Sequence, residues 1–463
     1  MRRRYSKDPS IDKSLRHSVK DGVAYSVMAG GGESYFSAFA LFLKATTEQI
    51  ALLASLPPLL GSFAQLVSAW LGHRTGRRKA IMLAGALLQA ISWFPLALLP
   101  LLFPDDAVSL MITCVVIYFA GANLAAPQWC SLMGDLVPER RRGRYFAFRT
   151  RLASITAFTA LVAGGVILHY FTESDYTLAG FILIFILAAV ARLISAYHLA
   201  RMQDIPGHVA ALEIPLGGEW WQRIRHSQFA RFSMFYGAMQ FAVAIASPFF
   251  SVYLLRDLHF SYLQFMACTA STVLMQFLTL NAWGRISDIF GNRLILVVTG
   301  FCIPALPGLW LISADFWYLL VVQALGGLLW AGFSLSAGNF LYDLIPSNKR
   351  ATYLAVHNVF VSIGVCIGAI LGGVLGGLDI LHSVVTRWQL DWPSVLYGVF
   401  IVSLLARLLV AVLFLPRLKE VRPVRTASIA LIFRVVRFNP ISGLIFDIVG
   451  SLRRYRKPRP GDL

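Results

Sequence analysis

The sequence has few charged side chains, and the acidic ones are in the minority, with 23 Asp and Glu against 41 Lys and Arg. Charged residues make up 14% of the 463 residues, whereas a soluble domain carries about a quarter. The five cysteines lie in apolar segments without paired spacing, which indicates packing residues rather than disulfides or metal ligands. The sequence also lacks a phosphate-binding glycine loop, a metal-ligand spacing and a nucleophile elbow. We therefore expect no enzyme, no cofactor and no bound metal.

Long apolar runs take the place of the missing charge. Hydrophobic residues make up 57% of the chain and the mean hydropathy is +0.66. The runs are about 20 residues long, the length that an α-helix needs to cross the hydrocarbon core. They predict an all-α membrane protein with twelve transmembrane helices, at 23–43, 49–71, 80–103, 108–133, 146–170, 177–200, 228–253, 262–284, 294–313, 316–341, 353–377 and 393–416.

The basic residues are placed unevenly along the chain. The net charge of +18 alone would suggest a nucleic-acid partner, but nearly all lysines and arginines fall in the predicted segments on one side of the membrane. The loops on the other side hold only Lys44, Arg256 and Arg387. This pattern places both termini in the cytoplasm and suggests contact with anionic lipids rather than nucleic acid. The polar start, MRRRYSKDPSIDK, predicts no cleaved signal peptide, and the absence of glycosylation sequons favours a bacterial inner membrane.

The chain contains an internal repeat. The segment 134–150 returns as 342–358 with matching Asp, Leu, Pro, Arg, Tyr and Ala. In the first and seventh predicted helices, the set Ser26, Gly30 and Glu33 matches the set Ser233, Gly237 and Gln240. Two parallel repeats of six helices, related by an axis along the membrane normal, fit this pattern. The predicted parts are a first bundle at 1–200, a cytoplasmic linker at 201–227, a second bundle at 228–416 and a basic amphipathic tail at 417–463.

A loop motif also occurs in both halves. GRISDIFGNR (284–293) follows the pattern Gly-x-x-x-Asp-x-x-Gly-x-Arg, and GHRTGRRKA (72–80) is its counterpart after the second helix. With twelve helices and a duplicated layout, the chain resembles the major facilitator superfamily over nearly its full length. The resemblance implies two bundles that rock around a central site, and loops that brace the cytoplasmic face. The first copy departs from the pattern because His73 stands where the acid is expected, so Asp135 is the candidate replacement.

The resemblance and the repeat together suggest a set of gating residues. Asp135 and Asp343 each lie seven residues before an arginine, so we predict a charge cluster at the cytoplasmic ends of helices four, five, ten and eleven. The predicted gating residues are Gly72, His73, Gly76, Arg77, Asp135, Arg142, Gly284, Asp288, Gly291, Arg293, Asp343 and Arg350.

Glu33 is an acid near the middle of the first predicted span. A carboxylate at this depth costs several kcal/mol unless it is neutral, paired or facing water. Ser26 and Ser37 share its predicted helix face. The matching face of the seventh helix carries Ser233, Tyr236 and Gln240. We predict that these six residues line a central solute site, with Glu33 also carrying the coupling proton.

Three roles for Glu33 stay open at this point: a proton carrier, a direct contact with the solute, or a structural acid held by a neighbouring helix. Two further charges within helices, Arg192 and Arg407, are interpreted as anchors whose side chains reach up to the membrane surface. Two short apolar pieces in 427–463, split at Asn439-Pro440, are interpreted as amphipathic helices on the cytoplasmic leaflet.

These features favour a secondary active transporter that moves a small organic solute by alternating access, coupled to protons through Glu33. Alternatives are an exporter of drugs or metabolites, an uncoupled facilitator, a lipid-handling carrier, and a sensor or scaffold that no longer transports. The expected partners are a small-molecule solute, protons and membrane lipids, and the protein is expected to work as a monomer.

Overall fold

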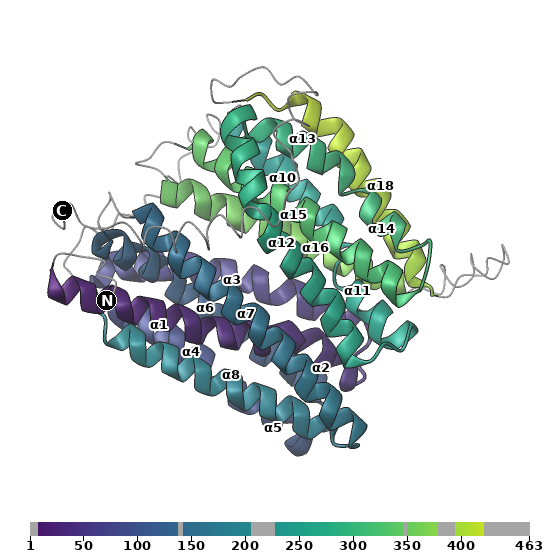
Figure 1. The fold of residues 1–463 in the computed structure, drawn as a ribbon, viewed down its shortest axis with the longest axis horizontal. Helices are drawn as coiled ribbons and strands as arrows, with labels where there is room; N and C mark the ends of the chain where they lie inside the picture. Colours follow the sequence, from purple (N-terminus) through teal and green to yellow (C-terminus); the bar gives the residue numbers. More distant parts are fainter. Residues whose placement is uncertain (1–7, 138–141, 205–226, 346–349, 378–393, 421–463) are drawn as a thin grey trace, which may run out of the picture.

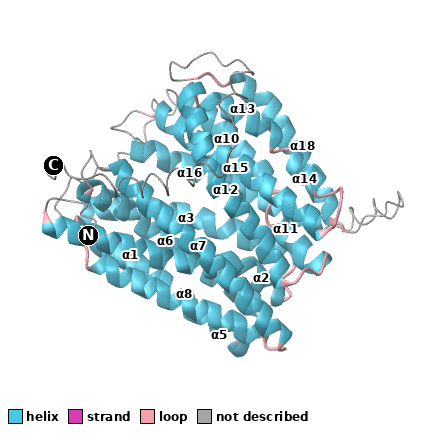
Figure 2. Cartoon of the chain, viewed as in Figure 1, coloured by secondary structure: helices cyan, strands magenta, loops and turns pink. Residues whose placement is uncertain are grey.

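The computed structural model describes residues 8–137, 142–204, 227–345, 350–377 and 394–420. All regular structure in these ranges is helical, and Figure 2 shows no strand among them. The predicted tail helices, most of the central linker and the loop at 378–393 lie outside the described residues. The helices of the first half are α1 (Pro9–Gly31), η1 (Glu33–Tyr35), α2 (Phe36–Phe42), α3 (Thr47–Thr75), α4 (Arg78–Ile91), α5 (Trp93–Leu102), α6 (Ala107–Leu136), α7 (Arg142–Glu173) and α8 (Thr177–Ala200).

The second half has the same order of helices. Figure 1 shows it in green and yellow beside the purple and teal first half. Its elements are α10 (Gln228–Ala244), α11 (Phe249–Val252), η3 (Tyr253–Asp257), α12 (Tyr262–Phe290), α13 (Asn292–Cys302), α14 (Ala305–Leu309), α15 (Phe316–Leu344), α16 (Arg350–Gly377), α18 (Leu396–Phe414) and η5 (Leu415–Arg417).

The packing of the helices repeats between the halves. In the first half α1 packs against α7 and α8, and α3 packs against α6. In the second half α10 packs against α16 and α18, and α12 packs against α15. The halves join through two equivalent pairs, α3 with α16 and α7 with α12. This arrangement has the two-fold pseudo-symmetry that the sequence repeat predicts.

The described residues include eleven helices long and apolar enough to cross a membrane. One of them, Thr177–Ala200, has the bounds predicted from the sequence. The first predicted span, 23–43, is not among the eleven, because α1 begins in the polar segment at Pro9 and ends at Gly31. The path then continues as the 3₁₀ turn η1 and the short helix α2. The multi-pass membrane architecture is confirmed, and the number twelve stays a prediction.

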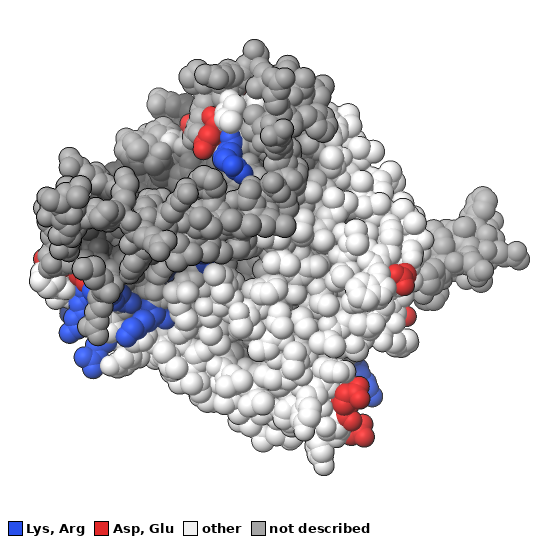
Figure 3. Space-filling view, viewed as in Figure 1, with Lys and Arg blue, Asp and Glu red and all other residues white. Residues whose placement is uncertain are grey.

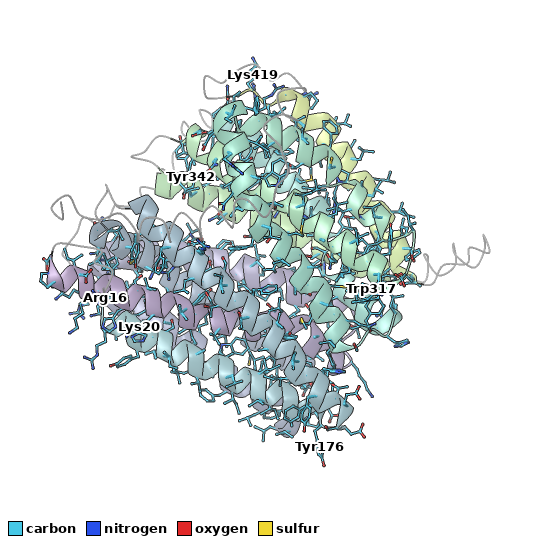
Figure 4. All side chains as sticks on the ribbon, in the orientation of Figure 1. Arg16, Lys20, Tyr176, Trp317, Tyr342 and Lys419 are labelled. Carbon is cyan, nitrogen blue, oxygen red and sulfur yellow. The ribbon has the colours of Figure 1, made fainter. Side chains whose placement is uncertain are left out.

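The surface shows the two ends expected of a membrane protein. Figure 3 shows basic side chains near the N-terminal end, acidic ones at the opposite end, and a largely uncharged belt between them. In Figure 4, Arg16 and Lys20 lie at the first end, and Trp317 and Tyr176 at the other. Trp317 and Tyr176 are 69% and 68% exposed, as aromatic residues at a membrane interface commonly are.

Two transmembrane paths are broken near their middle. In the first, α1 ends at Gly31, directly before Glu33. In the seventh, α10 ends at Ala244 because Pro248, four residues later, has no N–H to donate to the carbonyl of Ala244. Each break frees backbone groups that other side chains must satisfy.

The buried side chains of the described residues form one shared core and three that are confined to one half. Phe39 and Phe185 of the first half belong to the same cluster as Phe249 and Trp310 of the second. Toward the N-terminal end, one cluster contains only residues of the first half, and two others contain only residues of the second. The two halves therefore share a hydrophobic core at the acidic end of the molecule and keep their own cores at the basic end.

Candidate functional site

Glu33 lies at the break in the first transmembrane path. Gly32, directly before it, packs so closely against two neighbours that a Cβ there would lie 2.7 Å from both Trp93 and Ala188. Only glycine allows this approach, which fixes the position of the turn that carries Glu33. The hydroxyl of Tyr35, at the end of the turn, donates to the carbonyl of Leu161 at 2.5 Å. The carboxyl is thus held by backbone geometry as well as by its own contacts.

A buried tyrosine donates to Glu33. The Tyr118 hydroxyl lies 2.8 Å from Glu33 Oε2, and Tyr118 is fully buried. Among the described residues, no lysine or arginine forms an ion pair with Glu33. A carboxyl that is half-buried and has a neutral donor as its partner can exist as a neutral acid, and can lose its proton when water reaches it.

The predicted serine partners of Glu33 are placed differently. The Ser26 hydroxyl donates to the carbonyl of Gly22 in its own helix, at 2.7 Å. Ser37 lies beyond the break, in α2, and is half-buried. Because the 3₁₀ turn changes the helical register, the single face predicted for a continuous helix does not extend through this region.

The predicted residues of the second half gather around a histidine. Ser233 Oγ lies 3.0 Å from Nδ1 of His357, a buried residue of α16. The Tyr236 ring stacks on Phe333 and lies 5.4 Å from the His357 ring. Gln240 is one turn further along α10, and its buried Oε1 has no hydrogen-bond partner among the described residues.

Sequence reasoning did not place His357 in the site. The signal was present, because the 208-residue offset of the repeat aligns His357 with Arg149. Both residues project from equivalent helices onto the first helix of their own half: Arg149 contacts Asp21, and His357 contacts Ser233. One half therefore uses a charged contact where the other uses a neutral, aromatic-lined one.

A buried charge network lies below Glu33 in the first half. Asp21 is 3% exposed, and its carboxylate pairs with Arg149 Nη2 at 3.1 Å. Its other oxygen accepts from Ser195 Oγ at 2.7 Å, and Ser195 in turn accepts from Arg192 Nη1 at 2.7 Å. The Arg192 guanidinium also lies over the ring of Tyr25, 5.0 Å from its centroid. This network joins α1, α7 and α8.

The prediction that Arg192 and Arg407 are surface anchors is wrong. They are 4% and 2% exposed. Arg192 donates to the Ser195 hydroxyl, which links it to the carboxylate of Asp21. Arg407 donates to the carbonyl of Val243 at 3.3 Å, beside the Ser403 hydroxyl that bonds Ala242. A cation at the C-terminal end of a helix is favourable, so these α18 residues cap the broken end of α10.

The loop of the first half uses an arginine that the sequence prediction missed. Arg78 is buried and pairs with Asp135 at 2.5 Å and with Asp204 at 2.8 Å. Arg77, the residue predicted for this role, is exposed, as is His73. Gly76 turns the chain with φ 63°. The repeat could have indicated Arg78, because it follows Gly76 by two residues, as Arg293 follows Gly291.

The two remaining glycines of the loops differ in packing. A Cβ on Gly72 would lie 2.5 Å from the amide of Gln128, whereas Gly284 has only a distant contact with Leu335. Gly72 therefore allows α3 and α6 to pack closely.

The loop of the second half binds the segment that follows α18. The Arg293 side chain donates to the carbonyl of Leu418 at 2.6 Å, and its backbone N–H donates to Glu420 at 2.8 Å. Gly291 makes the turn with φ 84°, and Asn292 donates to Asp343 at 3.2 Å.

Asp288 is exposed, and none of the ion pairs between described residues involves it. The side chains of Arg142 and Arg350, predicted partners of Asp135 and Asp343, lie outside the described part of the chain. The predicted pairing across helices four, five, ten and eleven therefore stays a prediction.

The acidic end carries contacts between the two halves. Arg256 Nη1 donates to Thr47 Oγ1 at 3.2 Å. A Cβ on Gly373 would lie 2.5 Å from Ala51 Cβ, so α16 packs closely on the start of α3. Within the described ranges, no group of three or more His, Cys, Asp or Glu side chains is arranged to hold a metal.

The comparisons with known proteins agree with this architecture. The Major Facilitator Superfamily model matches residues 22–243 and 232–452. Three solved structures are similar at 14% identity: a nucleoside transporter (88% of this chain and 100% of that chain, TM-score 0.62), a D-xylose-proton symporter (89% and 98%, 0.64) and an auto-inhibited POT family peptide transporter (90% and 99%, 0.67). No curated protein sequence matches the chain.

Proposed function

The chain belongs to the major facilitator superfamily, and from this premise we propose that it is a secondary active transporter that carries a small organic solute together with protons. Glu33 is the observation that carries the proposal. It is the acid at the mid-membrane helix break, and the neutral hydroxyl of Tyr118 donates a hydrogen bond to it. Such a group can take up a proton in one conformation and release it in another.

The packing of the two halves supports alternating access. A shared core and the Arg256–Thr47 contact join the halves at the acidic end. The separate cores at the basic end leave each half able to move as a body. We infer that the described conformation is closed on the outside and that the solute enters or leaves from the basic end, which the charge pattern of the sequence assigns to the cytoplasm.

The solute site is proposed at the level of Glu33, between the broken helices of the two halves. Discontinuous helices near the bilayer midplane commonly form such sites. Ser233, Tyr236 and Gln240 remain the candidate contacts of the second half, and His357 joins them. The solved structures that share this fold include carriers of nucleosides, a sugar and peptides, and at 14% identity they show the fold alone.

The test compares Glu33→Gln with the same substitution at Glu48, an exposed acid at the start of α3. A screen of sugars, nucleosides, amino acids, organic acids and peptides for thermal stabilisation identifies the solute, since ligand at a hundredfold excess over Kd stabilises by about 2.7 kcal/mol. In proteoliposomes, Glu33→Gln should abolish uptake driven by a pH gradient and retain exchange of labelled solute. Glu48→Gln should retain both.

Other results would indicate the alternatives. Uptake by Glu33→Gln that still follows the pH gradient would refute coupling at Glu33. Loss of both uptake and exchange, with the protein folded, would make Glu33 a solute contact. Solute movement that is independent of pH in the wild type would indicate an uncoupled facilitator. If no compound in the screen stabilises the protein, a lipid carrier or a non-transporting sensor is favoured.

A further inference from the structure

Several buried polar atoms inside the first half have no hydrogen-bond partner among the described residues. They include the hydroxyl of Ser18, both polar atoms of the Gln89 amide, the indole nitrogen of Trp93 and Nε of Arg192. Ser18, Gln89 and Trp93 are fully buried, and Arg192 is 4% exposed. An unsatisfied buried polar group costs about 1–3 kcal/mol. Such groups in native proteins are usually satisfied by internal water.

These atoms follow one face of α1. Ser18, Asp21 and Tyr25 are three to four residues apart, so they stack along one side of the helix. On antiparallel α8, Ser195 lies beside Asp21, Arg192 beside Tyr25 and Ala188 beside Gly32. The two helices therefore present matching polar positions over several turns.

Two further helices complete the enclosure at its upper end. Gln89 is four residues before Trp93 and so shares its side of the α4–α5 segment. Trp93 touches Gly32, and its ring lies 5.1 Å from that of Tyr118, which donates to Glu33. We call this set the polar file; it consists of Ser18, Asp21, Tyr25, Gln89, Trp93, Arg192 and Ser195.

A pair of histidines stands at the lower end of the polar file. His17 Nδ1 and His198 Nδ1 are 3.0 Å apart, and both side chains are partly exposed. His17 precedes Ser18 directly, and His198 follows Ser195 by three residues. At this distance the Nδ1–H of one ring can donate to Nδ1 of the other, and the partial exposure of both rings gives water access to the pair.

We propose that Glu33 exchanges its proton with the cytoplasm through a hydrated path inside the first half, which starts at the His17–His198 pair and follows the polar file. From Ser18 to Glu33 the path covers about 22 Å along α1, at 1.5 Å per residue. It runs behind α1 and between α8 and α4, whereas the solute moves between the two halves. The inference rests on the proposed role of Glu33 as the proton carrier.

The path contains both charged groups and hydroxyls. Asp21 is paired with Arg149 and is linked through Ser195 to Arg192, so its carboxylate offsets one of the two guanidinium charges. The hydroxyls of Ser18, Tyr25 and Ser195 can both donate and accept hydrogen bonds, as a proton relay requires. The charged groups that face the path from the surrounding elements are Lys13, Lys20 and Asp21 of α1, Arg149 of α7, Arg192 of α8, and Arg201 after it.

The path can be tested without knowing the solute. The probe is the infrared carbonyl band of protonated Glu33, assigned by its loss in Glu33→Gln. After a jump from H2O to D2O, the rate at which this band shifts measures proton access to Glu33. Gln89→Leu replaces the unpartnered amide by an apolar group of similar size and should slow the exchange about tenfold, which corresponds to about 1.4 kcal/mol of barrier. Ser18→Ala should slow it as well.

Ser336→Ala is the matched control. Ser336 is also a fully buried serine with an unpartnered hydroxyl, but it lies on α15 in the other half. Its removal should leave the exchange rate unchanged.

Three results would overturn the inference. Wild-type rates in both Gln89→Leu and Ser18→Ala would show that protons reach Glu33 between the halves. Equal slowing in Ser336→Ala would indicate a general change in protein motion. A wild-type protein with no Glu33 band at any pH would overturn the proposed coupling role, and the path with it. Wild-type exchange rates in the two variants would refute the path but leave the coupling role of Glu33 intact. The failure of the path can therefore be told apart from the failure of the proposed function.

Discussion

Replacing Arg78 by glutamine should destabilise the cytoplasmic end of the first half, and the same change at Arg77 should not. The Arg78 side chain is 3% exposed and contacts two carboxylates, whereas Arg77 is exposed. The pair thus compares neighbouring arginines with the same substitution in one loop. The sequence pattern alone did not separate them.

The expected loss of unfolding free energy in Arg78→Gln depends on how exposed its two carboxylate partners are. Removing one partner of a fully buried ion pair costs about 3–5 kcal/mol, and an exposed pair contributes about 0–1 kcal/mol. The side chains of Asp135 and Asp204 are 36% and 33% exposed, so water partly solvates both carboxylates once the guanidinium is gone. We expect Arg78→Gln to cost about 2 kcal/mol, between these limits. Arg77→Gln should stay within about 0.5 kcal/mol of the wild type.

The assay is reversible unfolding in mixed detergent micelles, followed by tryptophan fluorescence. Asp135→Asn combined with Arg78→Gln should cost less than the sum of the two single changes, since both remove the same contact. Equal losses for Arg77→Gln and Arg78→Gln would refute the assignment, and so would a loss below about 0.5 kcal/mol for Arg78→Gln.

Two further predictions concern the helix break and the histidine pair. Gly32→Ala should destabilise the protein by about 1–3 kcal/mol, because the new methyl group meets Trp93 and Ala188. Gly338→Ala, at a position in α15 where a Cβ meets no described atom within 4 Å, should be neutral or stabilising in the same unfolding assay, and the reverse order would contradict the packing described at Glu33. Burial lowers the pKa of His17, and the charge of a protonated His198 lowers it further. The unfolded state therefore binds a proton more readily, so stability should fall as the pH drops below about 6.5, and His17→Gln should reduce this slope. An unchanged slope in that variant would exclude His17 as its source.

Much of the architecture could be predicted from the sequence because its causes are local. A run of apolar residues of sufficient length predicts a span wherever it occurs, and the run at 177–200 became α8 with the same bounds. The family resemblance is confirmed by the match over both halves. The first span was harder to predict, because hydropathy does not show that the helix stops at Gly31 and resumes after a 3₁₀ turn.

The site was predictable only in part. Glu33 was found because an acid in an apolar run is conspicuous, but its partner Tyr118 lies 85 residues away on another helix. In the sequence, nothing distinguishes Tyr118 from the other aromatic residues of the apolar segments. Ser26 was assigned to the site from its spacing and its match in the repeat, and its hydroxyl bonds the carbonyl of Gly22 in its own helix. Contacts between helices depend on rotation and depth, which spacing within one helix does not fix.

The sequence by itself determined the membrane class, the duplicated layout and the presence of a mid-membrane acid, because hydropathy, repeat and residue type are properties of the chain alone. The tertiary structure decided which charges are paired. It buried Arg192 against Ser195 and Arg407 at the end of α10, where both had been predicted to reach the surface. It also selected Arg78 over Arg77. The physical reason is that the cost of a charge in a membrane depends on its partners and its access to water, and both are set only when the helices pack.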